Sequence, residues 1–554
     1  MYEAEAGSDG LKPAPTKPSH FTLVLSQTHM TPEVIHHVYP GSGTEEDPYL
    51  VDWVPDDTKN PYEISTGMKW WITTIMAFGT LSVSLSSSAF SGGLRQIQSD
   101  FEVGSIVAIL SVSLFVLGFA IGPMAWAPMA ELYGRQRIYA AMFFLTTLFG
   151  GASIASPNIQ TLLVLRFFTG TFGSSAIVNS AGVISDIFVA KERGLAVMAY
   201  TSAPFLGPTL GPICSGFLAQ AGGWKWVDGL TVIFTGVMFF LGVIFVPETY
   251  TPYLLIRRAD KLSKITGKVY VSKLEAGKPK KTAASVFRTA IARPWVILIF
   301  EPIVLALSIY SSIVYGILYL IFTAFPIVFQ SERHWSQGIA GLAYLGIMIG
   351  QFLAMIFYVF LETLYQKKIA KDPSKATPEA RLTPAMIGGV LLPAGLFWFA
   401  WTTFSDVHWI VSIIGSSLFG IGQVLLFISL INYSIDAYTV FAASALAGNA
   451  ILRALFGAAF PLFTPIMYQN LGVQWASSIP AFLSLACAPM PFIFYKFGKW
   501  LRDRSKYAQE ARKIMDHILR QQRSETKEKD PVKVEAQLVA ASLTEEERLD
   551  GDSM

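Results

Sequence analysis

The sequence is short of cysteine, histidine and charge, and each shortage disfavours a class of protein. Its two cysteines, Cys214 and Cys487, lie in apolar stretches, which predicts neither a disulfide framework nor a cysteine metal cluster. The seven histidines show no paired metal-ligand spacing, so a metalloenzyme is disfavoured. Charged residues make up 15% of the 554 residues, whereas soluble domains contain about 25%. An ordinary soluble protein and a nucleic-acid-binding protein are therefore disfavoured as well.

Apolar residues are abundant instead, and they gather in long segments. Hydrophobic residues make up 52% of the chain, with 40 phenylalanines and 44 glycines, so the composition indicates that lipid is the solvent. A helix that crosses a bilayer needs about 20 mainly apolar residues. Twelve such segments are expected, at residues 68–91, 105–126, 138–155, 161–188, 194–219, 227–246, 294–322, 338–361, 385–401, 409–432, 441–467 and 475–497.

Lysine and arginine gather in every second loop, which predicts the orientation in the membrane. Basic residues are frequent in the loops around Arg135, Lys191 and Lys367 and in the middle connection around Arg257, whereas the opposite loops hold few. Because positively charged loops stay in the cytoplasm, both termini are predicted to be cytoplasmic. The first 67 residues are rich in proline, glycine and acid and show no signal-peptide pattern, so we expect a mostly disordered tail there.

The spacing of the segments predicts an all-α integral membrane protein built from two six-helix bundles. The expected parts are a tail at 1–67, a bundle at 68–249, a cytoplasmic connecting loop at 250–293, a second bundle at 294–498 and a cytoplasmic tail at 499–554. Residues 499–523 are expected to be helical and to lie either on the inner leaflet or in solvent. The halves share no obvious sequence repeat. Transporters of this layout bind substrate between the halves, near the midplane.

The loop after the second segment carries a cluster of charge around a glycine. Glu131, Gly134, Arg135 and Arg137 stand at a junction between a helix and a loop. Such residues form a charge clasp that holds neighbouring helices in one conformation, or they only anchor the loop on the cytoplasmic side. The residues alone leave both interpretations open.

The fifth segment combines prolines with small residues. Pro208 and Pro212, together with the proline at 204, recur every fourth residue and so fall on one helix face, where each loosens the helix. Gly207 and Gly211 form a seam that allows another helix to pack closely. Kinks and seam together predict a pivot between the two halves.

Of the charged residues inside the predicted spans, three are candidates for proton coupling, since charge in lipid is costly and often functional. Arg166 in the fourth span is a candidate for proton coupling, or an arginine that reaches the interface. Glu301 is expected about seven residues into the seventh span, where burial would raise its affinity for a proton; a structural role is the alternative. Arg453 lies in the middle of the eleventh span and needs a partner, for which Glu301 is a candidate.

These motifs resemble signature sequences of the major facilitator superfamily. The charged loop is similar to the family's Gly-x-x-x-Asp-Arg-x-Gly-Arg-Arg pattern, which Gly134 and Arg135 match and Glu131 matches conservatively. The loop departs from the pattern at Ala127, Leu132 and Gln136. Arg166 with Gly170 resembles an Arg-x-x-x-Gly motif near the family's proton-transfer machinery. The fifth segment resembles the Gly-x-x-x-Gly-Pro-x-x-Gly motif of drug:proton antiporters, with Ala203 at the first glycine position.

Further stretches across residues 68–505 resemble the fungal branch of the twelve-helix drug:proton antiporters. The resemblance implies the major facilitator fold and the export of drugs, toxins, secondary metabolites or polyamines, driven by inward proton flow. It implies no cofactor other than the proton gradient. The expected partners are a small amphipathic organic substrate, protons and the lipid bilayer, with no nucleic acid. We expect a monomer in the plasma membrane, with the vacuole or another endomembrane as the alternative.

The substrate is only coarsely indicated. The candidate cavity residues are Asn179, Tyr310, Tyr315, Gln351 and Asn449, which suit amphipathic organic molecules. Polyamine export is disfavoured because Glu301 is nearly alone as an embedded acid. Proton-linked uptake of a small nutrient remains the alternative within transport. An enzyme is not expected, since no nucleophile with a base, no clustered histidines and no paired carboxylates share one membrane depth.

Overall fold

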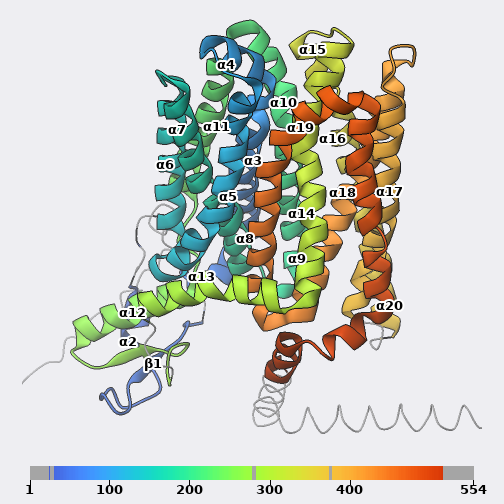
Figure 1. Ribbon diagram of the computed structural model, residues 1–554. Helices are drawn as coiled ribbons and strands as arrows, with labels where there is room; N and C mark the ends of the chain where they lie inside the picture. Colours follow the sequence, from blue (N-terminus) through green and yellow to red (C-terminus); the bar gives the residue numbers. More distant parts are fainter. Residues whose placement is uncertain are drawn as a thin grey trace, which may run out of the picture.

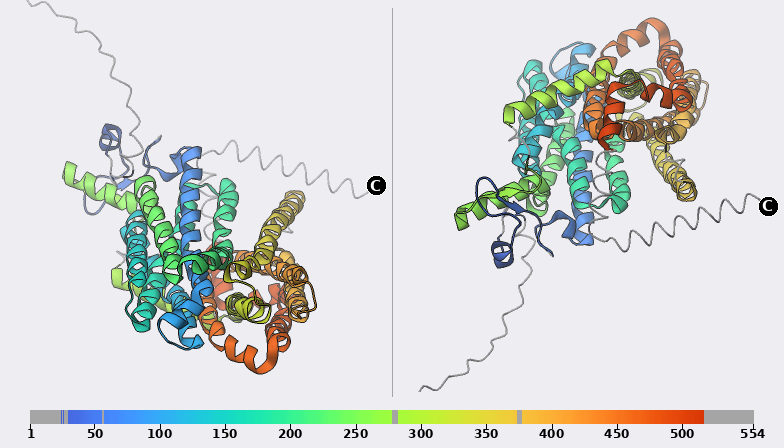
Figure 2. Two further views of the ribbon diagram at one scale, coloured as in Figure 1. Left: turned by 90° about the horizontal axis from the view of Figure 1, so that it is seen from above. Right: turned by 90° about the horizontal axis from the view of Figure 1, so that it is seen from below.

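Long helices stand side by side in two bundles in the computed structural model of the protein (Figure 1). The structure describes residues 24, 26, 30–55, 57–277, 282–372 and 377–515. Seen from above and from below, helices from the first half of the chain form one bundle and helices from the second half form the other (Figure 2). Among the described residues, β-structure is limited to one two-stranded sheet.

The first bundle is built from apolar helices that are frequently divided by short breaks. Its elements are α3 (Thr66–Ala89), η2 (Phe90–Gly93), α4 (Leu94–Asp100), α5 (Ser105–Tyr133), α6 (Arg135–Ile154), α7 (Ile159–Gly173), α8 (Ser175–Ile187), α9 (Ala190–Thr201), α10 (Ala203–Gly222) and α11 (Trp224–Phe245). Helix α8 continues in the direction of α7 after a short break, and α10 continues in the direction of α9 in the same way (Figure 1).

The second bundle follows the same plan with longer helices. Its elements are α14 (Pro302–Phe325), η3 (Pro326–Glu332), α15 (Gln337–Leu342), α16 (Leu345–Lys371), η5 (Pro378–Leu382), α17 (Thr383–Trp401), α18 (Trp409–Tyr438), η6 (Thr439–Phe441), α19 (Ala442–Cys487) and α20 (Met490–Arg502). The long α19 is divided at Gly472, whose φ of 72° is not helical.

Nine helical stretches among the described residues are long and apolar enough to cross a membrane. The last of them covers Trp409–Arg502 and includes two turns, at Thr439 and Gly472, where φ is positive. The α10 helix is not among the nine, and its 20 residues include four glycines and three prolines. The membrane-spanning, all-helical character predicted from the sequence is confirmed.

Part of the predicted N-terminal tail is folded, which differs from the expected disorder. Residues 30–63 contain α2 (Pro32–His36), β1 (Tyr49–Val51) and η1 (Pro61–Glu63). Strand β1 pairs in parallel with β2 (Tyr270–Ser272). The buried side chains of Tyr39 and Val51 pack on Leu255 and Leu262 of α12 (Thr251–Thr266), so the apolar face of α12 provides the core that the tail lacks by itself. Within the predicted tail, residues 1–23, 25, 27–29 and 56 lie outside the described ranges.

The seventh predicted span begins later than expected. Helix α13 (Ala283–Phe300) runs across the lower end of the bundles and ends at Glu301, and α14 starts only at Pro302 (Figure 1). The expected start at residue 294 is therefore wrong.

At the other end of the chain, residues 506–515 are helical and bury Ala508 and Ala511, which places this part of the predicted C-terminal helix against protein. Residues 516–523 lie outside the described ranges.

Candidate functional site

Arg135 is the centre of a charge cluster on the face of the molecule that carries α12, α13 and α20, called the clasp face below (Figure 1). Its Nε lies 2.5 Å from Oδ2 of Asp186 at the end of α8. The backbone N–H groups of Arg135 and Gln136 donate to the Glu248 carboxylate at 3.0 and 3.2 Å. Gly134 precedes them with a φ of 93°, and a Cβ atom there would collide with Glu248. The cluster thus ties α6 to α8 and to the end of α11.

The Glu248 carboxylate lies just beyond α11 and is almost fully buried. Burial raises its pKa, and the backbone N–H groups of Tyr250, Arg135, Gln136 and Thr249 oppose the rise. These donors stand at the first turn of α6 and in the chain after Glu248, so the carboxylate also caps the N-terminus of α6.

Arg381 holds an equivalent cluster on the clasp face of the second bundle. Its Nε donates to Asp436 at 3.1 Å and its Nη1 donates to Glu362 at 2.7 and 2.8 Å. Next to it, Nε and Nη2 of Arg502 donate to Glu379 at 2.8 and 2.9 Å. These contacts join α16, η5, α18 and α20. A cavity of about 640 Å³ opens beside this cluster, within the second bundle.

A buried ion pair lies inside the first bundle. Arg166 of α7 has no exposed surface, and its Nη1 lies 3.9 Å from Oδ1 of Asp228 of α11, which is equally buried. The guanidinium also donates to the Ser86 and Ser111 carbonyl oxygens at 2.8 and 3.2 Å. The Ser153 hydroxyl donates to the other oxygen of Asp228. The pair therefore links α3, α5, α6, α7 and α11.

The two bundles are sealed against each other at the end that carries α4 and α15, called the α15 face below (Figure 1). Gln96 donates to Gln337 at 3.2 Å, and the backbone N–H of Gly338 donates to Gln220 at 3.0 Å. A Cβ atom on Gly341 would lie 2.8 Å from the Pro212 carbonyl oxygen. The cavity between the halves at this end measures about 10 Å³, room for a single water molecule.

Further from the α15 face, polar side chains of both halves meet. The hydroxyl oxygens of Ser87 on α3 and Tyr319 on α14 lie 2.7 Å apart. Thr209 of α10 donates to Gln351 of α16 at 3.0 Å, and the Gln351 amide donates to Gln423 of α18 at 3.4 Å. No described hydrogen bond joins α8 or α9, which lead to the clasp face, to the second bundle. The hydrogen bonds between the halves are therefore concentrated away from the clasp face.

Arg453 of α19 lies at this interface and faces aromatic rings. Its Cζ is 5.0 Å from the ring centre of Tyr315 and 5.5 Å from that of Phe427. Phe427 in turn lies 5.6 Å from Phe205 of the first bundle, between ring centres. Arg453 is half-buried and forms no ion pair with a described residue. The interface thus contains a guanidinium balanced by rings and by no carboxylate.

Comparisons with known proteins identify this architecture. A family model described as the Major Facilitator Superfamily matches residues 76–461. The chain belongs to the major facilitator superfamily. It is therefore a multi-pass membrane protein of a transporter family, and the resemblance predicted from the sequence is confirmed.

Similar curated relatives of this facilitator are fungal. The chain is 52% identical to a Trichophyton rubrum protein named MFS-type efflux pump MFS2, over 94% of this chain and 87% of that protein. It is 50% identical to the Aspergillus fumigatus major facilitator superfamily multidrug transporter mdrA, over 92% of this chain and 84% of that protein. It is 49% identical to the Fusarium oxysporum efflux pump FUBT, over 91% and 85%.

Among solved structures, the facilitator chain is similar in fold to the xylose transporter XylE from E. coli. That match has a TM-score of 0.57 and 19% sequence identity, and it covers 78% of this chain and 98% of XylE. This similarity supports the fold of the two bundles and does not indicate what the chain transports.

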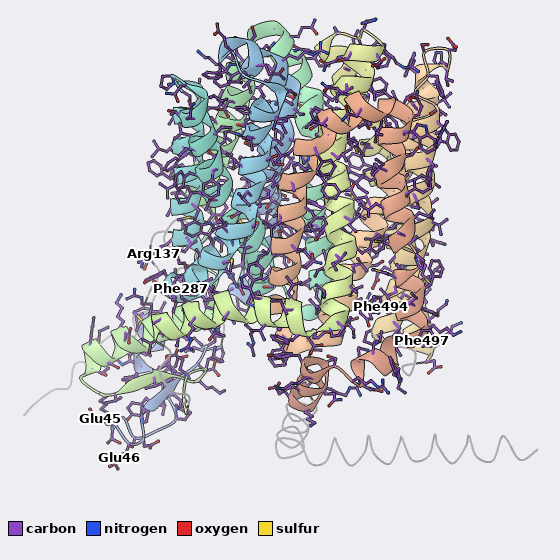
Figure 3. All side chains as sticks on the ribbon, viewed as in Figure 1. Glu45, Glu46, Arg137, Phe287, Phe494 and Phe497 are labelled. Atoms are coloured by element: carbon purple, nitrogen blue, oxygen red, sulfur yellow. The ribbon has the colours of Figure 1, made fainter. Side chains whose placement is uncertain are left out.

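Only two of the four residues predicted to form the charge clasp of the facilitator loop belong to the cluster around Arg135. Gly134 and Arg135 stand in the cluster, whereas Glu131 and Arg137 are exposed and form no ion pair with a described residue. Figure 3 shows Arg137 on the outer flank of the first bundle. The partner of Arg135 is Asp186, 51 residues away in the chain. That distance explains why the pairing could not be derived from the loop alone.

Glu301 does not lie inside a membrane span, and the prediction that placed it there is wrong. It stands between α13 and α14, at the clasp face, and is 1% exposed. Its carboxylate accepts from Tyr438 at 3.2 Å, from Ser505 at 2.5 Å and from the backbone N–H of Tyr507 at 3.0 Å. The considered pairing with Arg453 is also wrong, since none of these partners is Arg453.

The glycine seam of α10 packs on α3 within the first bundle, and its predicted role as a pivot between the halves stays a prediction. A Cβ atom on Gly207 would collide with Ser84 of α3, and one on Gly211 would lie 2.8 Å from the Leu85 carbonyl oxygen. The carbonyl of Pro208 has no helical donor because Pro212 lacks an N–H, and it accepts from Ser88 of α3 at 2.6 Å. Only the later part of α10, from Pro212 onwards, contacts α15 of the second bundle.

The predicted cavity residues are divided between the interface and the bundle interiors. Tyr315 and Gln351 lie at the interface, as described above. Asn449 donates to Ser311 at 2.7 Å within the second bundle. Tyr310 is fully buried, and a Cβ atom on Gly389 of α17 would lie 3.3 Å from its hydroxyl. Asn179 is fully buried in the first bundle and its amide has no described partner. The role of all five in substrate binding stays a prediction.

Asp228 is the residue of the facilitator core that sequence reasoning missed. It stands four residues after Trp224, near the start of a mainly apolar helix. A signal was present in the sequence, because an acid within 22 mainly apolar residues is as unusual as Arg166 in the fourth span. The two charges together would have suggested a pair.

Proposed function

We propose that the chain is a twelve-pass secondary transporter that exports small amphipathic organic compounds, such as drugs, toxins or secondary metabolites, in exchange for protons. The observation that carries the proposal is the interface between the halves, where Arg453, Tyr315 and Gln351 face the first bundle beyond a sealed α15 face. The relatives named as efflux pumps and as a multidrug transporter support export over uptake.

Eight of the candidate spans supply one pass each. The last one, Trp409–Arg502, is divided at Thr439 and Gly472 into three passes, and α10 adds the twelfth. Both termini and the clasp face are assigned to the cytoplasm. The basic residues of α12, among them Arg257, Lys261 and Lys264, support this orientation, since they stand on the clasp face. The plasma membrane is the proposed location, because an exporter removes its cargo from the cell only there.

Transport is proposed to follow from rocking of the two bundles about the interface. The clusters around Arg135 and Arg381 connect helices within one bundle and not between bundles. They therefore keep each bundle rigid at its clasp face while the halves separate. Cargo enters from the clasp face, and opening of the α15 face, with loss of the contacts of Gln96 and Gly338, releases it outside.

The buried pair of Arg166 and Asp228 is proposed to couple protons to this movement. Asp228 lies four residues from the α15 end of α11, about 6 Å along the helix. A proton that arrives when the α15 face is open neutralises Asp228 and releases its hold on Arg166. Because Arg166 also donates to the Ser86 and Ser111 carbonyls, its movement is transmitted to α3 and α5. Deprotonation towards the cytoplasm restores the pair.

The test is efflux of a panel of amphipathic compounds from preloaded cells of a pump-deficient host. Export is expected to be at least about threefold faster than in empty cells and to be abolished by a protonophore. Asp228→Asn, checked for surface expression, should abolish the response to the proton gradient. Glu301→Gln should keep it. Faster accumulation than in empty cells would mean uptake, and export that persists with the protonophore would overturn proton coupling.

A further inference from the structure

Arg453, Tyr315 and Phe427 lie at one depth of the molecule, close to its middle. Arg453 stands eleven residues after Ala442 at the clasp-face end of α19, and Phe427 stands eleven residues before Tyr438 at the same end of α18. At 1.5 Å per residue, both are about 16 Å from that end. Tyr315 is thirteen residues into α14, about 20 Å. Half of a bilayer core is about 15 Å, so the three residues lie near the midplane.

Charge at this depth is not balanced. Within the described spans, the charged side chains that lie away from the clasp face and are not exposed are Arg166, Asp228 and Arg453. Arg166 and Asp228 neutralise each other inside the first bundle. Arg453 remains as a positive charge at the interface of the halves, because a guanidinium keeps its proton.

An arginine near the midplane without a counter-ion is costly, and such residues mark ligand pathways. In this structure Arg453 is compensated only by the ring faces of Tyr315 and Phe427, at 5.0 and 5.5 Å. Cation–π contacts of this kind stabilise the charge only modestly. These contacts leave the N–H groups of the planar Arg453 guanidinium without an anionic hydrogen-bond acceptor. The half-buried side chain is thus prepared to receive one.

We infer that the interface binds organic anions, specifically amphipathic carboxylates with an aromatic or aliphatic body, and that Arg453 holds the carboxylate. A guanidinium binds a carboxylate through two parallel hydrogen bonds, a geometry that a neutral amide does not match. The rings of Tyr315, Phe427 and Phe205 supply apolar surface for the body of the molecule. The inference rests on the proposed export function and defines its substrate class.

The same charge argues against a polyamine as cargo. A polyamine would bring several positive charges to a site whose described charge near the midplane is itself positive, and like charges in a low dielectric repel strongly. The acids closest along the spans, Asp186 and Asp436, are held by arginines at the clasp face. An anion, in contrast, removes the unbalanced charge.

The test measures equilibrium binding to the full chain in lipid nanodiscs, with four labelled pairs. The acids are benzoate, 1-naphthoate, decanoate and 1-pyrenebutyrate, each compared with its uncharged methylamide. Wild type is expected to bind at least one acid about tenfold more tightly than its amide. Arg453→Gln should remove that difference by weakening acid binding more than amide binding, whereas Arg453→Lys should retain part of it. Arg288→Gln, an exposed site on α13, removes the same charge and should have no effect.

Equal binding of acids and amides by wild type, or equal weakening of both by Arg453→Gln, would overturn the inference. The efflux assay with neutral, cationic and anionic compounds separates this failure from a failure of the proposed function. If wild type exports neutral or cationic compounds and no carboxylate, the exporter stands and the anion site is wrong. If it exports none of the panel, the function is wrong as well.

Discussion

Nε of Arg381 lies 3.1 Å from the Asp436 carboxylate, and this contact repeats in the second bundle the contact between Arg135 and Asp186 in the first. Arg135 begins α6 and Arg381 lies in η5, directly before α17. The two aspartates stand near the clasp-face ends of α8 and α18. No repeat of sequence is evident between the halves, yet the two contacts occupy equivalent places. The two halves therefore share an arginine–aspartate contact at equivalent positions of the fold.

The contact of Arg135 with Asp186 is expected to stabilise the first bundle measurably. Both side chains are mostly buried, with 13% and 15% exposed, so the coupling should exceed that of a surface pair. A double-mutant cycle of Arg135→Ala and Asp186→Ala, read by thermal unfolding in detergent, should give about 1–3 kcal/mol. Each single variant should also slow export.

The matched control for this prediction is Arg137→Ala. It removes positive charge from the same loop, but the side chain is exposed and stands outside the cluster. If positive charge alone anchors the loop, Arg137→Ala and Arg135→Ala would affect stability equally. That result would contradict the clasp.

Glu301 marks a place where hydropathy alone does not predict the start of a membrane span. Residues 294–300 are apolar and only Glu301 separates them from the apolar α14, so the hydropathy pattern predicts one long span. In the structure Ile297 and Leu298 are buried while Ile299 and Phe300 are exposed, and α13 runs across the bundle ends (Figure 1). A one-sided apolar helix at the membrane surface and the first turns of a span have the same composition, and only the contacts of the chain separate them.

Glu301→Gln is expected to release the C-terminal segment and to leave proton coupling intact. The carboxylate accepts from Ser505 and from the Tyr507 backbone, so a neutral amide with one acceptor oxygen cannot satisfy both together with Tyr438. Hydrogen exchange of residues 505–515 should accelerate at least about tenfold. Loss of the protonophore response in this variant, with the segment still protected, would restore Glu301 as a proton carrier.

The buried pair of Arg166 and Asp228 illustrates what sequence reasoning reaches. The cost of a charge in lipid singled out Arg166, and the structure places it in the core as that cost requires. Its partner is 62 residues away on α11, next to Ser153 of a third helix. Which helix faces which depends on packing between whole bundles, and no local pattern contains that information. The sequence therefore indicated Arg166 as a costly residue but did not indicate its partner.

Gly211→Ala is expected to destabilise the first bundle because α10 and α3 touch there. The added Cβ atom would lie 2.8 Å from the Leu85 carbonyl oxygen and closer still to the Ser88 hydroxyl. Overpacking of this kind costs about 1–3 kcal/mol. We expect a lower melting temperature in detergent and less protein at the surface. Gly229→Ala, on α11 with open space around it, is the matched control and should behave as wild type. Equal behaviour of the two variants would contradict close packing at this seam.

Asp57→Asn is expected to detach the folded N-terminal segment from α12. The carboxylate of Asp57 is paired with Arg258, and their side chains are only 3% and 5% exposed. Neutralising one partner leaves the other charge buried, which costs about 3–5 kcal/mol for a fully buried pair. A segment held by one strand pair and a small apolar core has little stability to spare. Limited proteolysis should therefore cleave within residues 30–63 at least about tenfold faster than in wild type.

The control is the nearby pair of Asp52 and Lys273, whose side chains are 47% and 61% exposed. Lys273 helps to hold the pKa of Asp52 below its usual range, against the opposing effect of partial burial. An exposed pair of this kind contributes at most about 1 kcal/mol. Asp52→Asn removes the same formal charge from the same segment and should leave cleavage within about twofold of wild type. If both variants released the segment equally, loss of negative charge, and not the buried contact with Arg258, would explain the effect.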